Sequence, residues 1–374
     1  MIETVTVVGE DIPYAREFPT SYGDKRPSEH VFVRVETDGA SGFGEGSALR
    51  HFTGETTRTM EHLVADVFAP RVVGRPVNEA LAAFRAEADR FPGNPTAKTA
   101  VEMALLDLKA RSLGVPLADL LGVPRRDEVS LTFLAGARPA EDVADDVATA
   151  FDAGYRTFKV KADGTPSTDI ARLDAVTEVL HDAAPPDEVD VRVDANTGWV
   201  TAERTRQVIE RVGHREYLEY VEQPVAADAT GDLRSLRAGL DVPVFADEAV
   251  HDLADLRDLL SDPAAVSGAC LKLAKTGSLL DFEAMGALAA ASSAPVSVVS
   301  AFDTSVGMAA NLHLAAVLPR LSSAVELCAD MLVEDPVTDP IDIRPRVTVP
   351  SGPGLGVEPE PSLFEGGTTV TSGE

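Results

Sequence analysis

Residues 157–161 read Thr-Phe-Lys-Val-Lys and residues 189–194 read Val-Asp-Val-Arg-Val-Asp, two strand-like runs that each end in a charged side chain. Runs of this kind recur along the chain, and segments with helical periodicity lie between them. Connections of this length pair successive strands in parallel, and eight parallel strands close a β/α barrel. The predicted strands are residues 129–134, 157–161, 189–194, 220–222, 244–247, 269–273, 296–300 and 324–327, and the predicted helices are residues 139–153, 169–181, 201–212, 253–260, 279–290 and 305–318.

The first 125 residues predict a separate, mixed α and β unit. A β-hairpin is expected around the turn Asp38-Gly39, and the glycine-rich segments GFGEG (42–46) and GPGLG (352–356) are interpreted as turns rather than phosphate loops. The Pro/Gly-rich tail is expected to pack back on this unit. The hairpin strands are residues 30–37 and 42–47, and the helices are residues 56–68, 77–90 and 95–113, the last with Asn94 as N-cap and Pro95 at its first position.

Charged side chains stand at the ends of five consecutive predicted barrel strands. The carboxyl ends of barrel strands converge on one mouth, so these residues are expected to surround one cavity. A single acid at a strand end is more often a helix cap, and alternating lysines also suit an exposed edge strand, but a barrel has no exposed edge. Four of the seven lysines fall on only two strand ends. The residues are Lys159, Lys161, Asp194, Glu222, Asp247, Glu248, Lys272 and Lys275, of which Lys275 is assigned a structural or electrostatic role.

Three carboxylates on adjacent strands favour Mg²⁺, with Mn²⁺ as the alternative, because no histidine or cysteine accompanies them. A divalent ion held there can bind a substrate carboxylate and stabilise the charge that develops when the adjacent carbon loses a proton. Lys161 and Lys272 lie on opposite sides of the acids in strand order, so each can serve one face of the substrate carbon. Lys159 is expected to favour the neutral, basic form of Lys161 by charge repulsion.

The motifs FKVK, VRVDANTGW, YVEQP, FADEAV and LKLAKTG, in this order and spacing, resemble the muconate lactonising enzyme subgroup of the enolase superfamily, the mandelate racemase/muconate lactonising enzyme-like proteins. The resemblance extends over nearly the whole chain. It implies an α/β fold, a modified TIM barrel of the (β/α)₇β type (126–335), with an α+β capping domain built from residues 1–125 and the tail, 336–374. It also implies that Asp194, Glu222 and Asp247 are metal ligands, that Lys161 and Lys272 are acid/base residues with Lys159 beside them, and that Asn196, Glu248, Asp303 and Glu326 bind substrate or support the site.

The ends of the last two strands indicate the reaction. Acid-sugar dehydratases in the family place a His–Asp dyad towards the seventh strand, where this chain has Asp303 without a histidine; His313 is expected to be a packed or capping residue. Dipeptide epimerases carry Asp-x-Asp at the eighth strand, where this chain has Glu326-Leu327-Cys328. These features favour a cycloisomerase. An N-acylamino-acid racemase, a dipeptide epimerase, an o-succinylbenzoate synthase (a lyase) and a non-catalytic carboxylate-binding barrel are the alternatives.

A second substrate carboxylate would need a cation besides the metal. Arg16, Arg50 and His51, in the predicted capping loops 15–25 and 50–54, are the candidates, although exposed arginines on an acidic protein are more often ordinary surface residues.

The composition excludes several functions. The chain carries 61 Asp+Glu against 33 Lys+Arg, a formal net charge of −28, which disfavours nucleic acids and anionic membranes. Cys270 and Cys328 form no recognisable framework, and no signal peptide is evident, so a cytoplasmic protein is expected. The family resemblance implies a homo-oligomer that acts on a small carboxylate. The scarcity of lysine beside this acidity favours a halophilic source, with a GC-rich genome as the alternative explanation.

Overall fold

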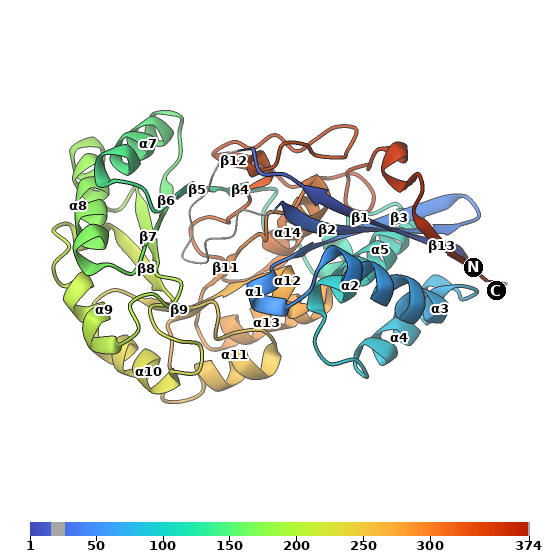
Figure 1. Ribbon diagram of the computed structural model, residues 1–374, viewed down its shortest axis with the longest axis horizontal. Helices are drawn as coiled ribbons and strands as arrows, with labels where there is room; N and C mark the ends of the chain where they lie inside the picture. The colour runs from blue at the N-terminus through green and yellow to red at the C-terminus, as the bar shows by residue number, and fades with distance from the viewer. Residues whose placement is uncertain (16–26, 373–374) are drawn as a thin grey trace.

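Seven parallel strands form most of a barrel, and an antiparallel sheet with helices caps one side of it (Figure 1). The computed structural model describes residues 1–15 and 27–372. In the barrel sheet the strand order is β11-β10-β9-β8-β7-β6-β5, so sequence neighbours are also spatial neighbours. The strands are β5 (Thr132–Ala135), β6 (Thr157–Lys161), β7 (Asp190–Asp194), β8 (Leu218–Glu222), β9 (Val244–Ala246), β10 (Gly268–Leu271) and β11 (Val296–Val298).

The predicted eighth strand, residues 324–327, closes the barrel without forming a regular strand. The backbone N–H of Thr132 donates to Val325 O (2.9 Å) on one side, and the N–H of Glu326 donates to Val298 O (2.9 Å) on the other. The predicted first strand is divided: β4 (Glu128–Ser130) pairs antiparallel with β12 (Arg346–Thr348) of the tail, and only β5 enters the barrel. The predicted barrel is confirmed.

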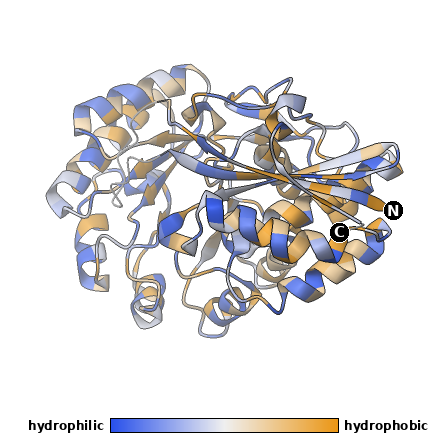
Figure 2. Cartoon of the chain, turned by 45° about the vertical axis from the view of Figure 1, so that its right-hand side comes forward, coloured by the Kyte–Doolittle hydropathy of each residue, from blue (hydrophilic) through white to orange (hydrophobic). Residues whose placement is uncertain are grey.

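Helices cover the outside of the barrel, and Figure 2 shows hydrophobic and hydrophilic residues alternating along them, as expected for helices with one buried face. The sequence did not predict α10, which is short and polar. The helices are α7 (Ala140–Asp152), α8 (Pro166–Ala183), α9 (Ala202–Ile209), η2 (Arg215–Tyr217), α10 (Thr230–Gly239), α11 (Leu253–Leu260), α12 (Leu273–Thr276), α13 (Leu279–Ala291), α14 (Ser305–Val317) and η3 (Ala329–Met331).

The capping domain is a four-stranded antiparallel sheet packed on helices. Its order is β13-β1-β2-β3, with β1 (Ile2–Ile12), β2 (Ser28–Thr37), β3 (Ala40–Ala48) and β13 (Thr368–Thr371). The predicted hairpin is confirmed, with Thr37 opposite Ala40, whereas β1 was not predicted. β13 of the tail pairs with β1, so the tail returns to the capping domain (Figure 1).

Two of the three predicted helices of the capping domain, 77–90 and 95–113, agree with the structure, whereas the short helices 50–53, 69–72, 118–121 and 361–364 were not predicted. The predicted helix 56–68 begins as α2 and continues as the π-helical η1. No helix within residues 1–15 and 27–372 combines the length and the apolar character that crossing a membrane requires. The helices are α1 (Arg50–Thr53), α2 (Thr57–His62), η1 (Leu63–Phe68), α3 (Ala69–Val72), α4 (Val77–Ala88), α5 (Pro95–Leu113), α6 (Ala118–Leu121) and η4 (Pro361–Phe364).

The interpretation of GFGEG as a turn is wrong, because residues 42–46 lie inside β3. These glycines allow α5 to lie directly against the strand: a Cβ atom on Gly44 would be 2.1 Å from Ala100 O. The second glycine-rich segment is a turn, as predicted, since Gly354 and Gly356 have φ values of 72° and 74°.

The N-terminus of α5 also differs from the prediction. Asn94 adopts a left-handed conformation (φ 55°), and its side chain does not cap the helix. Glu55, which lies far away in sequence, accepts hydrogen bonds from Thr96 N (3.0 Å) and Ala97 N (2.9 Å) instead. A buried carboxylate from another element therefore satisfies the first N–H groups of α5.

Candidate active site

Five predicted residues stand at the carboxyl ends of five neighbouring barrel strands. Lys161, Asp194 and Glu222 are the last residues of β6, β7 and β8, and they are register partners across the sheet. Asp247 directly follows β9, and Lys272 directly follows β10. Around the barrel mouth the order is therefore lysine, three acids, lysine.

The three acids form a buried, oxygen-only cluster. Asp194 is 1% exposed, and Glu222 and Asp247 are 0% exposed. Burial and the nearby charge of Asp194 raise the pKa of Glu222 to about 8. Burial alone would raise the pKa of Asp194, but Lys159 and Lys161 hold it at about 2. Oε2 of Glu222 is in ion-pair contact with Lys159 (2.7 Å). Three buried carboxylates that offer oxygen alone fit a hard divalent cation.

The two flanking lysines contact this cluster from opposite sides. Lys161 Nζ lies 2.5 Å from Asp194 Oδ2 and 3.1 Å from Asn196 Oδ1. Lys272 Nζ forms an ion pair with Asp247, and the Phe52 ring of the capping domain lies 4.8 Å from it. Burial opposes the charge on Lys272, yet Asp247 raises its pKa above the ordinary value. Both amines thus face the acids at the mouth of the barrel.

Lys159 lies deeper than Lys161 and is 2% exposed. Its Nζ is 3.1 Å from Asp194, 2.7 Å from Glu222 and 2.7 Å from Glu326. Burial disfavours its charged form, but these three carboxylates raise its pKa well above the ordinary value. The exposed-edge interpretation of this lysine is therefore wrong, and Lys159 is a buried counter-ion of the acids.

Lys275, which we assigned a structural or electrostatic role, also contacts Asp247. Its Nζ lies 2.5 Å from Asp247 Oδ1 and 2.5 Å from the carbonyl oxygen of Asp247. Gln223, which the sequence interpretation missed, accepts hydrogen bonds from Asp247 N (2.9 Å) and Ala249 N (3.1 Å). The motif YVEQP contained this glutamine, but only the fold shows that it positions the following strand end.

Asn196 and Glu248 extend the cluster at the rim. Asn196 has φ 40°, its N–H donates to Asp194 Oδ1 (3.0 Å), and its Nδ2 donates to Glu248 Oε1 (3.2 Å). The left-handed backbone at Asn196 is the kind of local strain that persists where surrounding contacts fix it. Both residues therefore lie beside the acids.

Glu326 lies in the interior of the barrel. Besides Lys159, its neighbours are Arg192 (Nη1, 3.5 Å) and the Tyr220 hydroxyl (3.5 Å). Arg192 is 0% exposed and donates to Thr132, Ser322 and the carbonyl of Ala324, among other acceptors. The sequence interpretation missed Arg192 because it is one more charged residue in an alternating strand.

Asp303 is joined to a different group of side chains. Its Oδ2 accepts hydrogen bonds from Ser300 Oγ (2.8 Å) and Asn311 Nδ2 (3.1 Å). Burial and the nearby Glu45 raise its pKa to about 6. Glu45, on β3 of the capping domain, accepts from Thr304 N (2.9 Å) at the start of α14. Asp303 therefore lies where the capping domain meets the barrel. Its hydrogen bonds go to Ser300 and Asn311 rather than to the three acids at the strand ends.

Arg16, Arg50 and His51 were the candidates to bind a second substrate carboxylate, and the structure describes two of them. Arg50 donates from Nη2 to Glu29 Oε1 (2.6 Å), and its Nε also contacts Glu29, so an acid of its own domain partners it. His51 packs on Phe52, with ring centroids 4.6 Å apart. Arg16 and most of the loop 15–25 lie outside the described residues. His313 is packed, as expected: it is 0% exposed.

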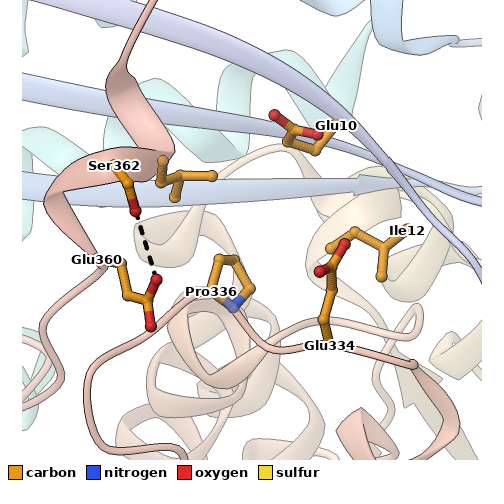
Figure 3. Close-up of a pocket in the computed structure, with 7 residues that line it drawn as sticks. Glu10, Ile12, Glu334, Pro336, Glu360 and Ser362 are labelled. Carbon is orange, nitrogen blue, oxygen red and sulfur yellow. Dashed lines mark hydrogen bonds between the residues drawn. The ribbon is translucent and has the colours of Figure 1, made fainter.

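A surface pocket between β1, η4 and the segment after η3 contains none of the predicted site residues (Figure 3). Three of its residues are glutamates, which would repel a carboxylate substrate. Its cavity volume, about 220 Å³, is also below the usual size of a small-molecule site. It is lined by Glu10, Ile12, Glu334, Pro336, Glu360, Ser362 and Leu363.

Two family profiles match nearly the whole chain. "Mandelate racemase / muconate lactonizing enzyme, N-terminal domain" matches residues 2–122, and "Enolase C-terminal domain-like" matches residues 142–363. The chain belongs to the mandelate racemase/muconate lactonizing enzyme family of the enolase superfamily. The resemblance seen in the sequence is confirmed, and so is the predicted fold.

Individual members of this family with different activities are similar to the chain. A chloromuconate cycloisomerase from Cupriavidus necator is 32% identical over 96% of this chain and 96% of its own. The crystal structure of an N-succinyl Arg/Lys racemase from Bacillus cereus has a TM-score of 0.90 at 26% identity and covers 99% of both chains. A dipeptide epimerase from Enterococcus faecalis, crystallised with Mg and a dipeptide, has a TM-score of 0.88 at 25% identity over 96% of this chain and 99% of that one. The protein is an isomerase of the enolase superfamily.

Proposed function

We propose that this isomerase is a Mg²⁺-dependent cycloisomerase of the muconate type, acting through an enolate next to a substrate carboxylate. The observation that carries the proposal is the order of side chains at the barrel mouth. Three buried acids lie between Lys161 on β6 and Lys272 after β10. Two amines on opposite sides of one metal-binding centre can reach opposite faces of a planar carbon.

We assign the metal to Asp194, Glu222 and Asp247, with Mn²⁺ as a substitute for Mg²⁺. The bound ion would supply electrostatic stabilisation to the substrate carboxylate and to the negative charge of the enolate. Asp247→Asn should weaken Mg²⁺ affinity in calorimetry, because it removes one of three anionic ligands. Unchanged affinity would transfer the ligand role to Glu248.

The lysines carry the proton steps of the proposed reaction. In lactone formation, an oxygen of one muconate carboxylate bonds to the carbon that is β to the other carboxylate. The π electron pair of that carbon's double bond moves to the carbon next to the second carboxylate. One lysine ammonium then donates a proton to that carbon, and the amine left behind regains a proton from solvent. In the reverse direction the neutral amine removes the same proton.

The remaining predicted residues have proposed supporting roles. Asn196 and Glu248 would orient Asp194 and Lys161 at the rim, and Glu326 would fix the position of Lys159. Asp303 is proposed to act near the substrate from the junction with the capping domain. The partner is a small carboxylate, and we expect a cytoplasmic homo-oligomer whose mass can be measured by light scattering.

A second candidate function is racemisation of N-succinylamino acids. The similarity to the Bacillus cereus racemase over 99% of both chains favours it. The same two lysines would remove the α-proton from one face and return a proton to the other. Dipeptide epimerisation and o-succinylbenzoate synthesis use the same groups and are tested alongside it.

An activity screen separates these reactions. Purified protein with Mg²⁺ would be given cis,cis-muconate, N-succinylamino acids, dipeptides and the precursor of o-succinylbenzoate. Lactone formation from muconate supports the cycloisomerase. Racemisation with muconate untouched would retain the metal site and both lysines but contradict the assignment based on Glu326. Binding of these carboxylates without turnover of any would indicate a non-catalytic barrel.

A further inference from the structure

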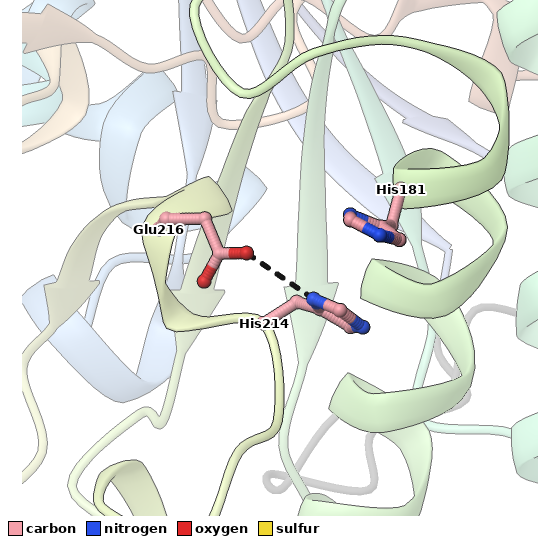
Figure 4. A group of neighbouring side chains, drawn as sticks. All are labelled: His181, His214 and Glu216. Carbon is pink, nitrogen blue, oxygen red and sulfur yellow. Dashed lines mark hydrogen bonds and ion pairs between the residues drawn. The ribbon is translucent and has the colours of Figure 1, made fainter.

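Two histidines and a glutamate gather on the outer surface of the barrel, on elements that do not contribute to the strand-end acids (Figure 4). His181 is in the last turn of α8, His214 lies in the loop before η2, and Glu216 is in η2. The two imidazole rings stack with centroids 4.1 Å apart and planes 18° apart. One ligand atom from each residue lies within 4.8 Å of the other two. Two of the seven histidines of the chain are thus placed against one carboxylate.

The loop that carries His214 and Glu216 is fastened to α8 on both sides of the cluster. Gly213 N donates to Asp174 Oδ1 (2.8 Å), and the Tyr217 hydroxyl donates to Ala184 O (2.7 Å). The Tyr217 ring meets both imidazoles edge-on, at 86° and 84°. These contacts hold the loop in place, so a ligand would bind a cluster that is largely formed in advance.

The geometry is close to that of a transition-metal site. His214 Nδ1 and Glu216 Oε1 are 3.2 Å apart. Two ligands of a tetrahedral Zn²⁺, each about 2.1 Å from the ion, are about 3.4 Å apart. His181 is exposed, so its side chain has room to adjust towards the same distance.

The local electrostatics also favour a cation. His181 is close to the C-terminus of α8, an 18-residue helix whose last carbonyl groups carry partial negative charge. Glu216 is an exposed carboxylate whose Oε1 lies 3.2 Å from His214 Nδ1, so it places a negative charge beside the two rings. Together these groups offer two imidazoles and one anion to an incoming metal.

We propose that His181, His214 and Glu216 bind one Zn²⁺ ion, with solvent as the fourth ligand. Nitrogen ligands select Zn²⁺, Co²⁺ or Ni²⁺ over Mg²⁺, whereas the strand-end acids offer oxygen alone. The ion would link the end of α8 to the segment that leads into β8, whose last residue is Glu222. The three ligands come together only in the folded chain, and an ion that binds only the folded state stabilises it. We therefore assign the ion a structural role.

Zn²⁺ binding to metal-free protein that has been saturated with Mg²⁺ tests the proposal. Excess Mg²⁺ occupies the oxygen site, so the calorimetric signal reports additional sites. We expect one equivalent of Zn²⁺ to bind and to raise the melting temperature. His214→Gln and His181→Gln should each lower the affinity at least about tenfold and abolish the thermal shift. Co²⁺ in place of Zn²⁺ should give the visible absorption of a tetrahedral ion.

Matched controls separate this site from other histidines and from the active site. His62→Gln removes another exposed histidine that is paired with an acid, Asp66, at 2.6 Å, and it should leave Zn²⁺ binding unchanged. Asp247→Asn should also leave it unchanged, and His214→Gln should retain any enzymatic activity. The proposal is overturned if Mg²⁺-saturated protein binds no Zn²⁺, or if the two histidine variants bind it as tightly as the His62 variant.

Discussion

Replacing Lys159 by methionine should destabilise the metal-free protein strongly and should make its stability depend on Mg²⁺. The lysine is 2% exposed, and its ammonium lies within 3.1 Å of Asp194, Glu222 and Glu326. Methionine nearly preserves the volume of the side chain but removes its positive charge. Removing one partner of a buried ion pair leaves uncompensated charge and costs about 3–5 kcal/mol. With three carboxylates affected, we expect the upper end of that range.

The charge argument also predicts how the loss is recovered. A divalent ion at Asp194, Glu222 and Asp247 would replace the missing positive charge, and the ion would no longer be repelled by Lys159. Saturating Mg²⁺ should therefore raise the free energy of unfolding of the variant by several kcal/mol more than that of the unmodified protein. Urea unfolding with and without Mg²⁺ measures both quantities.

Lys161→Met is the matched control for this experiment. The Lys161 side chain is 16% exposed, and within the described residues its one ion pair is with Asp194. Asp194 keeps Lys159 as a partner when Lys161 is removed, so the loss of Lys161 should cost less than the loss of Lys159. The reasoning is refuted if Lys159→Met is as stable as Lys161→Met in the absence of metal. It is also refuted if Mg²⁺ stabilises the Lys159 variant no more than the unmodified protein.

Three further predictions concern stability away from the acids. His313 accepts from Ala118 N (3.3 Å) and donates to Leu355 O (3.1 Å), and burial lowers its pKa from 6.5 to about 4. The imidazole of His313 binds a proton less tightly in the folded state than in the unfolded state. The free energy of unfolding is therefore full above pH 6.5 and falls by up to about 3 kcal/mol towards pH 4. Urea unfolding across this pH range should show a shallower fall for His313→Gln, and an equal fall with pH in the two proteins would contradict the assignment. Gly44→Ala should lower the free energy of unfolding by at least about 1–3 kcal/mol, because the added carbon clashes with α5. Gly231→Ala is the control: outside its own helix nothing lies within 4 Å of the added carbon, so thermal unfolding should show a neutral or stabilising effect. Equal effects of the two substitutions would refute the close packing of β3 on α5. If the acidity is a halophilic trait, the melting temperature should rise steeply with KCl concentration, and full stability at low salt would count against that source.

The sequence predicted the residues at the barrel mouth because one geometric rule connects them. Parallel strands end at the same rim, so Lys161, Asp194, Glu222, Asp247 and Lys272 could be brought together from spacing and residue type alone. Their order around the barrel needed only the rule that sequential strands are neighbours. The family resemblance then supplied their proposed roles.

The contacts that support these residues were not predictable in the same way. Glu55 caps α5 from another element, and Phe52 reaches Lys272 from the capping domain. Arg192 is fully buried although its strand alternates charged and apolar residues, because the barrel interior provides acceptors that no local pattern announces. Such contacts depend on tertiary structure rather than on local periodicity.

The errors in secondary structure have similar causes. The glycines of GFGEG suit both a turn and a close helix–strand contact, and only the position of α5 decides between them. Asn94 stands at the expected place for an N-cap, but its left-handed backbone directs the capping role to Glu55. Glycine and asparagine therefore correctly indicated positions where the backbone is unusual or closely packed. The structural reasons that the sequence suggested for these residues, a turn and a helix cap, were wrong.

Exchange of the substrate α-proton in D₂O tests the central claim most directly. Muconolactone and an N-succinylamino acid would each be incubated with Mg²⁺ and the unmodified protein, Lys161→Ala or Lys272→Ala, and deuterium incorporation would be followed by NMR. The account predicts exchange of at least one substrate by the unmodified protein, and a large loss of turnover of that substrate in both variants with folding and Mg²⁺ affinity retained. Absence of exchange by the unmodified protein, or undiminished turnover in either variant, would contradict the assignment of two opposed lysine bases.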